Sequence, residues 1–193
     1  MTAAAETSLQ LDMDPQMLPI PVDSGFVVIN PGFSGLQKGG YRAHRGWPVA
    51  HWQRLIELLT EHHDLSVLIN GTSEEQEYFV SLLQLPGVYS LFGSSLPTLA
   101  TALINADCLI TVDTGTMHFA SAVQTPVLAL FGPTNPELTG PYSNKLPHSM
   151  LISGVDCQPC FKTPEQKRCG FNRCMSELMP ERVFETCQQI LKS

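Results

Sequence analysis

Short apolar runs alternate with longer amphipathic stretches along the chain from residue 26 onward. A continuous apolar run of about 4–8 residues between turn signals is typical of a strand that is buried on both faces. The runs of this kind cover residues 26–30, 65–70, 88–92, 108–112, 126–131 and 149–153. The pattern therefore predicts six buried strands.

Helical periodicity fills the intervals between these runs. The first predicted helix opens at Pro48, a favourable first helical residue, and has one apolar face made of Trp52, Leu55, Ile56 and Leu59. Further helices are predicted over 73–83 with Ser73 as N-cap, over 96–105, after the loop that follows Val112, and from Pro180. Strands that alternate with helices predict an α/β fold with right-handed crossovers and a mostly parallel, doubly wound sheet.

Composition narrows the organisation of the chain and its partners. The 193 residues, 43% of them hydrophobic, suit one domain with a real core. We assign residues 1–24, which lack periodicity, to a tail or interdomain linker and residues 25–193 to the domain. A net charge of −7 argues against a nucleic-acid partner, which would need a basic excess on one face.

The sequence also bears on the compartment. It has no apolar stretch of the roughly 20 residues that span a bilayer, and its start lacks the features of a signal peptide. We therefore expect a cytoplasmic protein. In a reducing compartment its six cysteines favour metal or redox chemistry over a disulfide scaffold.

The loop after the fourth apolar run is the first candidate binding site. It reads Asp113, Thr114, Gly115, Thr116, Met117 and His118. A helix that opens on a turn of small residues presents free backbone N–H groups and a positive dipole end to an anion. Gly115 would let a phosphate approach the backbone, and Thr114, Thr116 and His118 could add hydrogen bonds. The alternative is a structural role, with Asp113 or Thr114 as the N-cap.

A second turn, over residues 131–136, follows the next strand. If the two strands are neighbours, this turn lies beside the first loop. Thr134 and Asn135 could then face the same ligand. The alternative is an ordinary Gly/Pro turn.

A basic loop follows the first strand. Residues 24–56 contain no Asp or Glu, yet they include Lys38, Arg42, Arg45 and Arg54. Most of these cations lie in the glycine-rich loop 32–47, and a loop of this length is usually functional or mobile. We expect it to clamp a diphosphate and stabilise it as a leaving group. The alternative is a solvated loop with scattered charges.

Four cysteines form a candidate metal site in a Cys-rich loop at 155–176. Cys157, Cys160, Cys169 and Cys174 have the spacing C-x2-C, eight residues, C-x4-C. Four thiolates could enclose structural zinc or iron in a tetrahedral site. The spacing is shorter than that of a zinc ribbon, so two disulfides or four free thiols stay open. Cys108 and Cys187 are better interpreted as small core residues.

Several motifs together resemble one family. They are INPG at 29–32, RGWP at 45–48, VDTGTMHFASAVQTP at 112–126 and LFGPTNP at 130–136. Their order and spacing resemble the C-terminal half of glycosyltransferase family 9, the ADP-heptose:lipopolysaccharide heptosyltransferases. The resemblance extends over roughly 24–192, and the segment CxPC…C…CM is similar to that of many members.

The resemblance implies the Rossmann-like donor-binding half of a two-domain (GT-B) enzyme. In relatives the DTG loop and the following His hold the diphosphate, which corresponds here to Thr114, Gly115, Thr116 and His118. A Lys before the W-P pair usually contacts the phosphates, and its place is taken here by Arg45. A Glu after the second strand binds the ribose, for which Glu74 and Glu75 are candidates; the alternative for both is N-terminal helix charge.

The same resemblance implies the reaction and its partners. We expect heptosyl transfer from ADP-heptose in lipopolysaccharide or related glycan synthesis, with no catalytic metal and with Arg45 and His118 in catalytic positions. The general base and the glycan or lipid-linked acceptor would belong to an N-terminal half missing from this chain, and the full enzyme could contact the inner membrane peripherally. The alternatives are another sugar-nucleotide enzyme of GT-B architecture, such as an epimerase, and a non-catalytic, metal-stapled Rossmann module.

Overall fold

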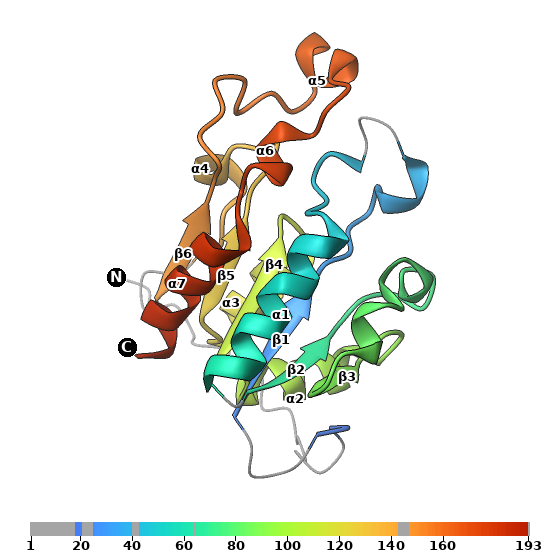
Figure 1. The fold of residues 1–193 in the computed structure, drawn as a ribbon, viewed down its shortest axis with the longest axis vertical. Helices are drawn as coiled ribbons and strands as arrows, with labels where there is room; N and C mark the ends of the chain where they lie inside the picture. Colours follow the sequence, from blue (N-terminus) through green and yellow to red (C-terminus); the bar gives the residue numbers. More distant parts are fainter. Residues whose placement is uncertain (1–17, 21–24, 40–42, 64, 143–146, 193) are drawn as a thin grey trace, which may run out of the picture.

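The six predicted strands form one parallel sheet. The computed structural model describes residues 18–20, 25–39, 43–63, 65–142 and 147–192. The strands are β1 (Phe26–Asn30), β2 (Ser66–Ile69), β3 (Val88–Ser90), β4 (Cys108–Val112), β5 (Val127–Leu130) and β6 (His148–Leu151). Their order in the sheet is β3-β2-β1-β4-β5-β6 and every pairing is parallel, which confirms the doubly wound α/β prediction (Figure 1).

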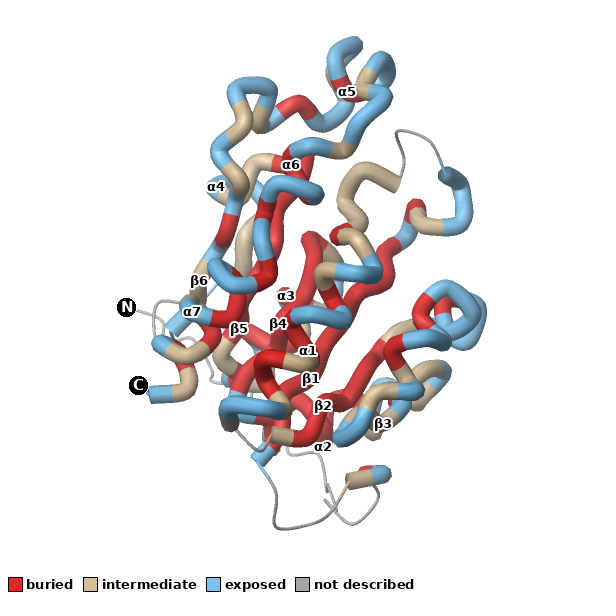
Figure 2. Tube along the Cα trace, viewed as in Figure 1, coloured by how far each residue is buried: buried red, intermediate tan, exposed pale blue. Residues whose placement is uncertain are grey.

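Helices cover both faces of the sheet. The first face carries α1 (Val49–His63) and α7 (Pro180–Leu191), which pack against each other, and the second carries α2 (Leu96–Asn105) and α3 (Gly115–Ala122) (Figure 1). The central strands are therefore buried on both sides, as Figure 2 shows along β1, β4 and β5. This double burial explains why their sequences are continuous apolar runs rather than alternating ones.

The helix predicted over 73–83 is wrong in type. Two short 3-10 turns occupy this stretch, η4 (Gln76–Phe79) and η5 (Leu82–Gln84). The buried side chains, Phe79 and Leu82, are three positions apart, and a 3-10 turn places residues i and i+3 on one face. The predicted N-cap at Ser73 is also wrong, because the first 3-10 turn has Glu75 at its N-cap position.

The ends of the predicted domain are partly described. The tail or linker expected over 1–24 lies outside the described residues except for 18–20, where Leu18 is buried among side chains of the α2 and α3 face.

The Cys-rich segment contains two short helices, α5 (Pro164–Arg168) and α6 (Arg173–Ser176). Among the described residues, no helix has both the length and the apolar character needed to cross a membrane.

The sheet reverses its strand order between β1 and β4, and this position determines where a site can form. The connections that follow β1 and β4 go to opposite faces of the sheet, to α1 and α3, so the loops at the carboxyl ends of these strands separate and leave a crevice. The residues that follow β1, β2 and β4 at this edge are the INPG segment, residues 70–75 and the loop 113–115. The start of the basic loop and the loop that begins at Asp113 therefore meet at the topological switch point, whereas the turn 131–136 follows β5.

Candidate functional site

A buried amide network connects the ends of β1 and β2 to the first turn of α3. Oδ1 of Asn30 accepts hydrogen bonds from Nδ2 of Asn70 at 2.6 Å and from Oγ1 of Thr116 at 3.0 Å. Nδ2 of Asn30 donates to the carbonyl of Gly32 at 3.1 Å. Both asparagines are buried, so this network holds three separate chain segments in one arrangement.

The N-terminus of α3 faces open space at this network. Thr114 is in the N-cap position with extended backbone, and its side chain makes no capping hydrogen bond. Its hydroxyl lies 3.3 Å from that of Thr111. A Cβ at Gly115 would meet no atom within 4 Å, and Gly115 does not have a positive φ. Neither the backbone conformation nor the packing therefore requires glycine at this position. An anion that approaches the N–H groups would require it, because a side chain would occupy the same space.

Glu75 and Glu74, the two ribose candidates, both line the cavity described below but differ sharply in environment. Glu75 is buried, and its carboxylate accepts the N–H of Thr72 at 2.9 Å. A Cβ at Gly32 would overlap this carboxyl group, so the close approach needs glycine there. Glu74 is exposed, and hydrogen bonds from its own backbone and from Thr72 lower its pKa.

Arg45 links the basic loop to the end of β4. Its Nη1 donates to the carbonyl of Asp113 at 3.1 Å and lies 3.9 Å from the Asp113 carboxylate. Its Nη2 donates to Oγ of Ser34 at 3.3 Å, and the guanidinium lies 5.5 Å from the centre of the Phe33 ring. These contacts hold a partly exposed cation beside the N-terminus of α3.

The amide network, Thr114 and both glutamates line a cavity of about 470 Å³ at the carboxyl edge of the sheet, whereas Arg45 does not. Its walls come from β1, β2 and α3, and from residues 93–99, which enter α2. Polar residues of the wall include Asn30, Asn70, Thr72, Glu75, Thr114 and Thr116. A second cavity of about 470 Å³ adjoins it and is lined by residues 33–38 and 72–75, among them Lys38. The space suits a ligand with one anionic end and one hydroxyl-rich part.

Three further predicted residues lie at or beyond the edge of this arrangement. His118 is exposed in the first turn of α3 and lines none of these cavities. Thr134 is buried, and its hydroxyl has no hydrogen-bond partner. Asn135 caps α4 (Pro136–Thr139) by accepting the N–H of Glu137 at 3.0 Å, which matches the ordinary-turn interpretation. Arg42 lies outside the described residues.

All six cysteines are free thiols, so the structure contains neither of the two disulfides considered from the sequence. Cys108 and Cys187 are fully buried in the core, as predicted. In the Cys-rich segment, Cys160 and Cys174 are buried and Cys157 is exposed. The four thiols lie close enough to affect one another: burial and then the neighbouring Cys160, Cys157 and Cys169 raise the pKa of Cys174 to about 12.

Two of the four thiols of the predicted metal site make hydrogen bonds to other groups. Sγ of Cys169 donates to the carbonyl of Phe171 at 2.9 Å, and Sγ of Cys174 donates to Oδ1 of Asn172 at 3.3 Å. Within the described part of the chain, no three His, Cys, Asp or Glu side chains are arranged to hold a metal ion. The donor set is suited to zinc or iron by its chemistry, but the side chains are not oriented as ligands.

Sequence reasoning missed the two asparagines at the centre of the site. A signal was present, because the runs FVVIN and LSVLIN both end on the pair Ile-Asn. A polar residue that ends two neighbouring buried strands lies at the same edge of the sheet. Asn30 and Asn70 could have been placed beside each other on that basis.

The architecture and the site define a Rossmann-like α/β domain with a polar cavity at its switch point. A family model, Glycosyltransferase family 9 (heptosyltransferase), matches residues 4–169, and the chain belongs to this family. It is 34% identical over 158 residues to lipopolysaccharide heptosyltransferase 1 of Pseudomonas aeruginosa, an alignment that covers 75% of this chain and 44% of that protein. The chain thus spans about half the length of the curated relatives it matches.

Solved structures show the same fold. The E. coli ADP-heptose lps heptosyltransferase II superposes with a TM-score of 0.72 at 21% identity, covering 90% of this chain and 48% of that one. E. coli heptosyltransferase WaaC with ADP superposes with a TM-score of 0.66 at 23% identity, covering 89% and 46%. Both are GT-B heptosyltransferase structures of which this domain matches about half.

Proposed function

We propose that this chain is the donor-binding half of a heptosyltransferase and binds ADP-heptose. The observation that carries the proposal is the open N-terminus of α3, where a Cβ at Gly115 would meet no atom within 4 Å and where Thr114 and Thr116 line one cavity together with the buried Glu75. A nucleotide-sugar donor needs both an anion site and an acceptor for ribose hydroxyls. The family membership and the name of the relative solved with ADP support the same ligand.

In this proposal the diphosphate lies over the first turn of α3. The N–H groups of Gly115 and Thr116 and the hydroxyl of Thr114 donate to phosphate oxygens, because the first turn of a helix leaves its N–H groups without intrahelical partners. The Glu75 carboxylate accepts hydrogen bonds from the ribose. Glu74 is not part of this assignment, because it is exposed whereas Glu75 is buried.

The reaction proposed is transfer of the heptosyl group to an acceptor hydroxyl. The bond from the anomeric carbon to the diphosphate oxygen breaks, and ADP leaves with the bonding electron pair. Arg45, together with Lys38 and the α3 dipole, stabilises the charge that develops on the leaving diphosphate, which is electrostatic catalysis without a metal. His118 is exposed in the first turn of α3, outside the cavity wall, and we assign it as a donor to the outermost phosphate oxygens. The base that accepts the acceptor proton belongs to a second domain, which also forms part of the site for the lipopolysaccharide-type acceptor.

Calorimetric titration of the purified chain with ADP, UDP, GDP and ADP-heptose tests the donor assignment. We expect binding of the two adenine compounds and loss of at least about tenfold in affinity in the Arg45→Ala, His118→Ala double variant, because each removes a charged or polar contact to phosphate. Arg54→Ala is the matched control, since Arg54 is an exposed cation on α1 paired with Glu57 and Glu181.

Other results of this titration would contradict the proposal. A preference for UDP or GDP would favour another sugar-nucleotide enzyme of the same architecture. Binding of no nucleotide would favour a module that keeps the fold without the transfer chemistry.

We further propose that Cys157, Cys160, Cys169 and Cys174 hold a structural zinc or iron ion. Support comes from the soft four-sulfur donor set within eighteen residues, and binding requires the side chains of Cys169 and Cys174 to turn away from Phe171 and Asn172. Metal analysis of protein purified under reducing conditions tests this. Close to one equivalent supports it, whereas less than about a tenth of an equivalent would contradict it.

A further inference from the structure

A third cavity, of about 380 Å³, lies between the basic loop and the Cys-rich segment. Lys38 and Arg45 come from the basic loop, and Lys162 and Lys167 come from the segment that includes α5. Ser34 and Phe161 also line it. We call this space the cationic pocket. We call the cavity at the switch point, to which the proposed function assigns the donor, the nucleotide cavity.

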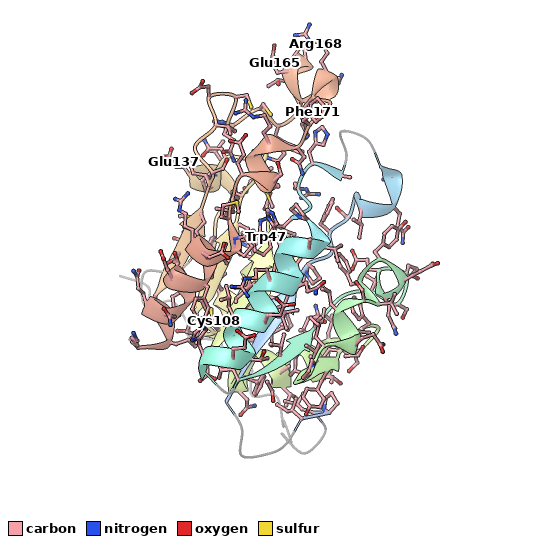
Figure 3. All side chains as sticks on the ribbon, in the orientation of Figure 1. Trp47, Cys108, Glu137, Glu165, Arg168 and Phe171 are labelled. Carbon is pink, nitrogen blue, oxygen red and sulfur yellow. The ribbon has the colours of Figure 1, made fainter. Side chains whose placement is uncertain are left out.

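The charge of the cationic pocket is one-sided. Four of its lining residues are cations and none is an Asp or Glu, in a chain whose net charge is −7. The nearest acidic residue of α5, Glu165, pairs with Arg168 at 3.2 Å. Figure 3 shows Glu165 and Arg168 at the outer tip of the Cys-rich segment. Like charges gathered around a concave space attract an anion and are unfavourable without one.

The wall formed by the Cys-rich segment is held in place by hydrogen bonds. The N–H groups of Cys160 and Phe161 both donate to the carbonyl of Pro133 at 2.8 Å, directly after β5. Lys162 has a φ of 64°, a backbone conformation that is uncommon for residues other than glycine. Its N–H donates to Oε1 of the buried Gln166 at 2.7 Å. Nζ of Lys162 lies 5.4 Å from the centre of the Phe161 ring.

The nucleotide cavity and the cationic pocket share Ser34, whose hydroxyl accepts a hydrogen bond from Arg45 of the cationic pocket. The donor carries its negative charge on the diphosphate, which our proposed function places at α3 and Arg45, and a heptosyl group is neutral. The positive charges of Lys162 and Lys167 are therefore not needed to bind the donor. A second anion, brought by the other substrate, would compensate this charge.

We propose that the cationic pocket binds an anionic group, a phosphate or a carboxylate, carried by the acceptor. This inference rests on the proposed function, since the acceptor is defined by the transfer reaction. It makes the Cys-rich segment a part of acceptor recognition, with Lys162 and Lys167 as specificity-determining residues. The acceptor's charged group would lie next to the departing diphosphate, with the cations of the basic loop between the two.

Titration of the chain with inorganic phosphate and, separately, with acetate tests the inference, at constant ionic strength and with ADP either absent or saturating. We expect at least one of the two anions to bind in the presence of ADP. The Lys162→Ala, Lys167→Ala double variant should weaken that binding by about tenfold or more, since two charged contacts are lost. Its affinity for ADP should stay within about twofold. Arg168→Ala is the matched control, because Arg168 lies on α5 but does not line the pocket.

The outcomes separate the inference from the proposed function. Anion binding that depends on the two lysines supports the inference, and the anion that binds more tightly identifies the chemical group. Displacement of the anion by ADP, or equal anion binding in the double variant, would overturn it while leaving the donor assignment intact. Failure of ADP to bind, with lysine-dependent anion binding retained, would instead overturn the donor assignment.

Discussion

The nucleotide cavity and the Cys-rich segment are built in different ways. The cavity lies at the ends of buried parallel strands, and its polar groups are joined by the network around Asn30. The Cys-rich segment has mostly exposed residues, two helices of five and four residues, and attachments such as Nε2 of Gln158, which donates to the carbonyls of Phe131 and Gly132 (Figure 2). Phe171 at its tip is 82% exposed (Figure 3).

This difference shows how one domain can combine a preformed site with an adaptable one. A cavity whose walls are strand ends and helix termini keeps its geometry without ligand, because the sheet positions every segment. A segment with few buried contacts has a lower local stability and depends on hydrogen bonds, on a metal or on a ligand for its order. We therefore expect substitutions in the two regions to affect different measurements.

The largest effect is expected at Glu75. Glu75→Gln removes the negative charge that would accept ribose hydroxyls but keeps an oxygen for the N–H of Thr72. The affinity for ADP should fall by about 10- to 100-fold, since hydrogen bonds to charged groups contribute about 1.5–3 kcal/mol. Glu77→Gln is the neighbouring control, because Glu77 is exposed and lines neither cavity, and it should change the affinity by less than about twofold. Equal losses in the two variants would remove the distinction between them.

A smaller but more diagnostic effect is expected at Gly115. In Gly115→Ala the new methyl group meets no protein atom, and alanine is favoured over glycine in a helix. The unfolding temperature should therefore rise, and the free energy of unfolding should increase by about 0.5–1 kcal/mol. The same methyl group would occupy space needed by the diphosphate, and ADP affinity should fall by about tenfold. Calorimetry for both quantities checks the pair of results. A variant that is stabilised and still binds ADP normally would show that phosphate does not approach this backbone.

The smallest effect on the nucleotide cavity is expected from changes in the Cys-rich segment. Chelation of the proposed metal, or the Cys160→Ser, Cys174→Ser double variant, should lower Tm by about 5 °C or more, because a ligand that binds only the folded state stabilises it. ADP affinity should stay within about twofold, because the cavity walls come from other elements. A parallel loss of ADP affinity would mean that the two regions are not independent.

The sequence predicts the sheet well because its strands are buried on both faces, which leaves runs such as CLITV without polar interruptions. It also predicts the loop 113–118, since a strand, a turn of small residues and a helix are adjacent in the chain. The α-helix predicted over 73–83 is wrong because the buried residues Phe79 and Leu82 are three positions apart, a spacing that suits both an α-helix and a 3-10 turn. Only tertiary packing decides between these two.

Contacts between residues that are far apart in the chain also cannot be predicted from the sequence, because they depend on tertiary packing. Glu74 and Glu75 are equivalent as letters, and the opposite burial of their side chains depends on how the turn packs against Gly32. The hydrogen bonds from Asn70 and Thr116 to Asn30 join positions that are 40 and 86 residues apart. Cysteine spacing likewise predicts four nearby thiols but not the directions in which they point, which the hydrogen bonds of Cys169 and Cys174 determine.

Backbone amide NMR of the 15N-labelled chain during titration with ADP tests the central claim most directly. The account predicts that the largest chemical-shift changes fall on Gly115 and Thr116, with further changes at Thr72 and Glu75 and only small ones at Cys157–Cys174. Such a pattern would place the diphosphate on the N-terminus of α3 and the ribose at the buried carboxylate. Changes confined to the Cys-rich segment, or the absence of any change at Gly115 in ADP-saturated protein, would contradict the account.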